Sequence, residues 1–262
     1  MKIKLYNMEW DSNIFKYSPI NENLVASLHD HYLWFSDPAA FNDPYDLNIP
    51  LIVPEYSIQD LTRFGTDMVS SGRGQGRTVE QVVNFYSNNP RKMQENMQLR
   101  ADQFASRIGI CCYSEHDDTL LMWSHYADKH RGVCLKFEMP ENDPFFNVPI
   151  KVHYPSKFPH FDFIEMRKDN YSLLQFLVGT KSVDWQYEAE IRIAKGMGMY
   201  DVFRGAIQFD KKRLTEVIFG YKADPEVIER IKSQIVSDGY DCSFYKMILK
   251  PDDFGLAKEK ID

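Results

Sequence analysis

Two carboxylates and a guanidinium alternate with apolar residues late in the chain. Glu188, Glu190 and Arg192 are each separated by one residue, which is the period of a β-strand and predicts all three side chains on one face. Two neighbouring carboxylates shift each other's pKa, so one can act as a general base while the other stabilises positive charge. The alternative is a solvated strand face with weak cross-strand ion pairs.

A second concentration of reactive side chains lies in residues 108–137. Residues 108–113 have the length and apolar character of a buried strand, and residues 133–137 have those of another. Between them, Asp118 occupies the position of a helix N-cap. The short helix predicted after it would carry His125. The strand, helix and strand would gather the polar side chains of this stretch in one neighbourhood.

The third candidate feature is a proline-flanked loop at residues 36–46. Its two prolines disfavour a regular helix, and its Ser, Asn and Asp side chains can cap their own backbone. A stiff loop at the end of a strand can also hold a ligand, through Ser36, Asn42, Asp43 and Asp46. Spacing alone leaves both interpretations open.

The elements that must position these side chains are mostly strands. Strands are predicted for residues 14–17, 32–35, 108–113, 133–137, 150–154, 185–193, 206–209, 217–220 and 242–249. Helices are grouped at about residues 55–107, where Ser57 and Thr78 each open a capping box. Strands and helices do not alternate regularly. This indicates an α+β fold with a mainly antiparallel sheet system, in one domain over residues 1–262 with a helical insertion.

Composition narrows the class of protein. The chain is 44% hydrophobic and 26% charged, with a net charge of -7. This balance is typical of a soluble globular protein and argues against a broad surface for duplex nucleic acid. Neither a signal peptide nor a membrane-spanning stretch is evident, so a cytoplasmic location without a membrane partner is expected. His125 and His130 lack the spacing of helical metal ligands, so no metal site is predicted.

Several blocks of sequence, taken in order, form a recognisable signature. They are Phe15-Lys16-Tyr17, Phe41-Asn42-Asp43-Pro44, Cys112-Tyr113-Ser114-Glu115, Trp123-Ser124-His125-Tyr126, Gly132-Val133-Cys134-Leu135, and Lys181 with Trp185-x-x-Glu188-x-Glu190-x-Arg192. This signature resembles that of a prokaryotic domain-of-unknown-function family, numbered 2971 in its name. The resemblance runs from about residue 14 to about residue 249. The family name brings no established reaction.

A more distant similarity implies a reaction. A polar pair on an early strand (Lys16-Tyr17), a serine ending the next strand (Ser36) and a late Glu-x-Glu strand are arranged in an order similar to that of ADP-ribosyltransferases. Those enzymes bind NAD in a cleft between two small sheets. The resemblance implies split antiparallel sheets and NAD as a substrate. Glu190 would hold the ribose hydroxyl and stabilise the cationic centre formed as nicotinamide leaves, and Glu188 would position or deprotonate the acceptor.

The predicted site follows from these features. Its catalytic residues are Glu190, Glu188 and His125, and its NAD-binding residues are Lys16, Tyr17, Ser36, Asn42, Asp43, Trp123 and Tyr126. The acceptor could be a protein, a nucleic acid or a small molecule. Two other functions stay open. One is a non-catalytic effector of a bacterial defence or toxin system that binds a partner or nucleic acid. The other is a nucleotide or phosphoester hydrolase using His125, Asp43 and Glu115.

Overall fold

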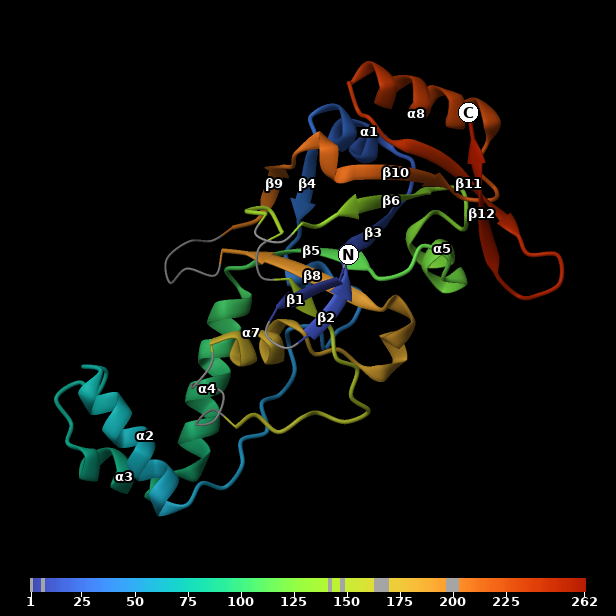
Figure 1. Cartoon of the computed structure of the whole chain (residues 1–262). Helices are drawn as coiled ribbons and strands as arrows, with labels where there is room; N and C mark the ends of the chain where they lie inside the picture. The colour runs from blue at the N-terminus through green and yellow to red at the C-terminus, as the bar shows by residue number, and fades with distance from the viewer. Residues whose placement is uncertain (1, 6–7, 141–142, 147–148, 163–169, 197–202) are drawn as a thin grey trace.

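An eight-stranded sheet organises the chain in the computed structural model, which describes residues 2–5, 8–140, 143–146, 149–162, 170–196 and 203–262 (Figure 1). The strand order is β12-β11-β10-β6-β3-β5-β8-β7. The strands are β3 (Asn13–Ser18), β5 (Gly109–Ser114), β6 (Val133–Glu138), β7 (Ile150–Lys151), β8 (Glu190–Lys195), β10 (Leu214–Phe219), β11 (Ser243–Leu249) and β12 (Leu256–Ile261). Neighbours are antiparallel except β10 and β11. The predicted mainly antiparallel α+β architecture is confirmed.

Two small strand pairs accompany this sheet. β1 (Lys2–Leu5) pairs with β2 (Met8–Asp11), and β4 (Tyr32–Phe35) pairs with β9 (Gly205–Gln208). β4 is also tied to the large sheet, because the backbones of Ser36 and Ile110 exchange two hydrogen bonds of 2.9 Å. The end of β4 and the loop after it therefore lie beside β5.

The large sheet is almost interrupted between β3 and β5. β3 pairs with β6 along its whole length, from Asn13 to Ser18, but its register with β5 consists of Phe15 opposite Ser114. The two strands diverge from this single point of pairing. The expected split of the sheet is thus present only in part, as an opening in the middle of one continuous sheet.

Helices cover both faces of the sheet. On one face, α1 (Glu22–His29) and α8 (Pro225–Ser237) bury apolar residues against β3, β6 and β10. α8 places Ile228, Ile231 and Ile235 inward at helical spacing, and Asp224 caps it by accepting from two backbone N–H groups. On the other face, α5 (Leu120–Tyr126) packs Met122 and Trp123 against β3.

The helices predicted for residues 55–107 are present and project away from the sheet (Figure 1). They are α2 (Ile58–Ser70), α3 (Val79–Asn88) and α4 (Pro90–Ala105), and both predicted capping boxes are formed. Their own apolar core includes Phe64, Met93 and Phe176, the last from α7 (Asn170–Val178). In the described part of the chain, no helix is both long and apolar enough to span a lipid bilayer.

The strand predicted for residues 185–193 is wrong in its first half. Val183–Glu188 form a 3₁₀ helix, η2, which Ser182 caps by accepting from the Asp184 N–H group. Ala189 then adopts a left-handed conformation, with φ of 43°, and β8 begins at Glu190. A local cap therefore overrides the apparent alternation of residues 185–188. The predicted alternation holds from Glu190 onward.

Two further predictions need correction, and three strands were not predicted. Asp118 is not the N-cap of α5, because the helix begins at Leu120 with Thr119 in the cap position and without a side-chain cap bond. The predicted strand at residues 150–154 is limited to Ile150–Lys151. The strands β1, β2 and β12 were not predicted, because β1 and β2 have four residues each and β12 has charged residues at three successive positions.

Gly132 holds α5 close to β3. A Cβ atom at this position would lie 2.3 Å from the carbonyl oxygen of Ser18 and 2.9 Å from the backbone of Ala127. Replacing Gly132 with alanine is therefore expected to lower the free energy of unfolding by about 3 kcal/mol, since neither backbone segment can move without disturbing the core. Urea unfolding followed by circular dichroism measures this change.

Gly255→Ala provides the control for this prediction. The added Cβ would lie 3.2 Å from the flexible side chain of Lys250, which can move aside, so a change within about 0.5 kcal/mol is expected. Equal unfolding midpoints for Gly132→Ala and the parent protein would contradict the proposed role of this close backbone approach.

Candidate functional site

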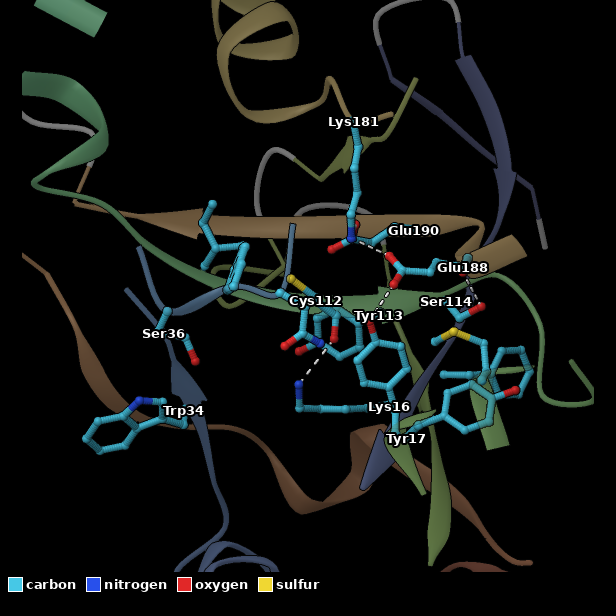
Figure 2. Close-up of a pocket in the computed structure, with 17 residues that line it drawn as sticks. Lys16, Tyr17, Trp34, Ser36, Cys112, Tyr113, Ser114, Lys181, Glu188 and Glu190 are labelled. Atoms are coloured by element: carbon cyan, nitrogen blue, oxygen red, sulfur yellow. Dashed lines mark hydrogen bonds and ion pairs between the residues drawn. The ribbon is translucent and has the colours of Figure 1, made fainter. Parts of the chain in front are cut away.

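A pocket of about 230 Å³ lies where β3 and β5 separate (Figure 2). Seven of the ten predicted site residues line it: Lys16, Tyr17, Ser36, Asn42, Tyr126, Glu188 and Glu190. They come from β3, the end of β4 and its loop, α5, η2 and β8. The late carboxylates and the early proline-flanked loop therefore meet at one pocket.

The other three predicted site residues do not line this pocket. His125 is exposed on α5, with Nδ1 3.0 Å from the Tyr187 hydroxyl. Asp43 is buried in its loop and accepts from the Tyr45 N–H group. Trp123 is fully buried and donates to the Asp117 carbonyl oxygen.

Trp123 reaches the pocket only through a neighbour. Its ring packs edge-on against Tyr17, with 5.3 Å between the ring centroids. The Tyr17 hydroxyl donates to the carbonyl oxygen of His116 over 2.8 Å. Tyr17 therefore contributes a fixed aromatic wall to the pocket, and Trp123 supports that wall from behind.

The residues of the hydrolase hypothesis are not brought together at the pocket. Glu115 pairs with Lys151 at 2.8 Å, whereas His125 and Asp43 have the separate partners described above. Within the ranges that the structure describes, no group of three or more His, Cys, Asp or Glu side chains is placed to hold a metal ion.

Arg192 is the fixed centre of a buried ionic network behind the pocket. It is fully buried, and its five N–H bonds are directed at Glu190, Asp46 and the carbonyl oxygen of Val178, over 2.6–3.0 Å. A guanidinium has five donors in a rigid plane, so all of its hydrogen-bonding capacity is used inside the protein. Arg192 is therefore a positioning residue with no donor left for a ligand.

Glu190 is held ionised by this network. Its two carboxylate oxygens accept from Arg192 at 3.0 and 2.9 Å, and the Lys181 ammonium group lies 3.4 Å away. Burial alone would raise the pKa of the Glu190 carboxyl, but the charges of Arg192 and Lys181 outweigh burial and lower that pKa to about 2. The predicted alternative of a solvated strand face is wrong, because Glu190 is 4% exposed and Arg192 is 0% exposed.

Glu188 has a different environment. One carboxylate oxygen accepts from the Tyr126 hydroxyl and the other from the Lys181 ammonium group, each over 2.5 Å. Burial raises the pKa of the Glu188 carboxyl, and the negative charge of Glu190 raises it further. Ser114 fixes the backbone here, since its hydroxyl donates to the Glu188 carbonyl oxygen over 2.7 Å.

The buried network carries an excess of negative charge. It contains three carboxylates, Asp46, Glu188 and Glu190, but two cations, Lys181 and Arg192. Glu188, Glu190 and Lys181 line the pocket, whereas Asp46 and Arg192 do not. Positive charge that develops in the pocket would therefore be stabilised there.

Lys16 supplies positive charge on another wall. Its side chain projects into the space between β3 and β5 (Figure 2), and its ammonium group donates to the Cys112 carbonyl oxygen over 3.1 Å. The pocket thus combines an acidic wall of glutamates with a basic group. This arrangement suits a ligand with one cationic part and one anionic part.

Sequence reasoning left several pocket and network residues out of the predicted site. These residues are Trp34, Asp46, Cys112, Ser114 and Lys181. Asp46 and Lys181 could have been inferred from Arg192 and the two glutamates, because charges on a buried strand need partners. Trp34 gives no such signal, since an aromatic residue in a strand usually indicates core packing.

Comparison with known proteins assigns a relationship to one part of the chain. A family model described as a protein of unknown function (DUF2971) matches residues 122–193. The matched segment includes Tyr126, Lys181, Glu188, Glu190 and Arg192. Searches of curated proteins and of solved structures gave no match to this chain. Residues 122–193, which carry most of the ionic network behind the pocket, are thus similar to the family of proteins of unknown function DUF2971.

Proposed function

We propose that this protein is an ADP-ribosyltransferase-like enzyme that cleaves the bond between nicotinamide and ribose in NAD. The observation that carries the proposal is the meeting of Glu188 and Glu190 with Lys16, Tyr17 and Asn42 at one pocket in the opened sheet. The surplus negative charge beside this pocket favours a reaction in which a sugar carbon becomes positively charged.

The chemistry requires one bond to break and one to form. The bond between the ribose carbon and the nicotinamide nitrogen breaks, and its electron pair leaves with neutral nicotinamide. An acceptor oxygen or nitrogen, or water in the absence of another acceptor, then bonds to the same carbon and loses a proton. A carboxylate with a raised pKa, such as Glu188, is suited to accept that proton.

The contacts of the two glutamates favour Glu188 as the group that works on the ligand. Both oxygens of Glu190 are occupied by the buried Arg192 guanidinium, so Glu190 supplies fixed negative charge. Glu188 is held by Tyr126 and Lys181, which are both pocket residues. Tyr126 and Lys181 can exchange a hydrogen bond to Glu188 for one to a bound ribose.

The pocket fits one end of NAD. Its volume of about 230 Å³ lies below the range of about 300–1,000 Å³ typical of pockets that enclose a whole ligand. The rings of Tyr17, Tyr113 and Tyr126 offer flat walls for a planar group, and the nearby carboxylates offer acceptors for ribose hydroxyls. These residues fit the nicotinamide riboside half of the molecule.

Replacing Asn42 with alanine is expected to weaken NAD binding about fivefold to tenfold, as for the loss of one hydrogen bond to a ligand. Asn42 lines the pocket from an exposed loop position and also hydrogen-bonds to the Tyr126 side chain. The measurement is the rise in unfolding temperature at increasing NAD concentration.

Asn48→Ala is the matched control for this binding experiment. Asn48 follows the same loop, and its amide donates to the Pro44 carbonyl oxygen rather than lining the pocket. We expect its NAD response to equal that of the parent. The absence of any stabilisation of the parent at millimolar NAD would count against the proposed substrate.

A further inference from the structure

A second hollow adjoins the pocket. It has a volume of about 470 Å³ and lies among β3, β4 and the start of α1. Lys16 and Trp34 line both spaces. The two spaces therefore meet at an ammonium group and an indole ring, and together they form a site that is longer than the glutamate pocket alone.

Trp34 is unusually exposed for its position at this junction. The buried side chains of β4 are Leu33 and Phe35, whereas Trp34 on the opposite face is 57% exposed. Figure 2 shows Trp34 on the far side of the pocket from Glu188 and Glu190. An exposed indole beside a hollow offers a flat face on which a nucleobase can stack.

Lys16 lies between this platform and the glutamates. Its ammonium group donates to the Cys112 carbonyl oxygen and also interacts with the Cys111 side chain. An ammonium has three donors, so these contacts leave capacity for an anionic oxygen. Asn21, Asn23 and Ser27 add polar groups around the second hollow.

We infer that the second hollow is a subsite for the adenosine half of a dinucleotide, with the adenine stacked on Trp34 and the diphosphate bound by Lys16. The inference rests on the proposed function for the identity of the other half of the ligand. The two halves of one molecule then occupy the two hollows. The nicotinamide riboside lies beside the glutamates, the diphosphate beside Lys16 and the adenine on Trp34. The same two residues would bind free ADP.

Titration of ADP by calorimetry tests this subsite, because ADP lacks the nicotinamide riboside half. We expect Trp34→Leu to raise the Kd for ADP at least about tenfold, since base stacking on an aromatic side chain contributes about 1–3 kcal/mol. Trp34→Phe retains an aromatic face and is expected to stay within about threefold of the parent. Lys16→Met should weaken binding of ADP more than binding of adenosine.

Phe254→Leu is the control, because Phe254 is 98% exposed and does not line either hollow. Its Kd for ADP should equal that of the parent, and unfolding temperatures show whether each variant is folded. An unchanged Kd in folded Trp34→Leu, or failure of the parent to bind ADP, would overturn the inference.

The same variants separate this inference from the proposed reaction. Nicotinamide release by the parent with an unchanged KM for NAD in Trp34→Leu would retain the reaction and reject the subsite. Trp34-dependent binding of ADP without nicotinamide release would retain the subsite and reject the reaction.

Discussion

Replacing Arg192 with methionine is expected to lower the free energy of unfolding by about 3–5 kcal/mol. Arg192 donates four of its five hydrogen bonds to two buried carboxylates, Asp46 and Glu190. Both carboxylates would lose this partner. Lys181 alone would then face three carboxylates. Denaturant unfolding at pH 7 measures the change.

Arg131→Met is the matched control. Arg131 also pairs with an aspartate, Asp128, at 3.1 Å, but both side chains are 50% exposed. Exposed pairs contribute about 0–1 kcal/mol, so a much smaller change is expected. Equal losses for Arg192→Met and Arg131→Met would show that the buried network does not have the structural role assigned to it.

Replacing Glu188 with glutamine is expected to reduce nicotinamide release from NAD about 100-fold to 1,000-fold without loss of stability. Glutamine has almost the same shape and can still accept from Tyr126. Lys181 retains Glu190 at 3.4 Å as a partner. The change removes the surplus negative charge and leaves two carboxylates with two cations, so the unfolding temperature should stay equal or rise. Greater stability with lost activity is typical of functional groups held in an unfavourable environment.

Glu115→Gln provides the control for this activity loss. Glu115 is also a partly buried glutamate paired with a lysine, Lys151, but it does not line the pocket. We expect its nicotinamide release to remain within about twofold of the parent. A Glu188→Gln variant that is folded and fully active would remove Glu188 from the mechanism.

Apolar periodicity and capping residues predicted much of the fold. The capping boxes at Ser57 and Thr78 and the strands around Cys112 and Cys134 are all observed. Each of these signals depends on residues close together in the sequence. Strand order and the opening between β3 and β5 depend on pairing over long separations, which a local pattern does not encode.

The candidate site was predictable where residue chemistry demanded a partner. Glu190 and Arg192 on one face of a strand indicated a charged cluster, and the structure places Asp46 and Lys181 around them. His125 was predicted at the site because of its chemistry, but a one-residue difference in helix phase decides whether a side chain faces a pocket or solvent. Its neighbour Tyr126 lines the pocket instead.

The most direct test of the central claim is the time course of nicotinamide release when purified protein is mixed with NAD. We predict release that saturates with NAD concentration and is lost in the folded Glu188→Gln variant. Release no faster than in a protein-free sample, from a folded parent at saturating NAD, would contradict the claim that the pocket between β3 and β5 cleaves this bond.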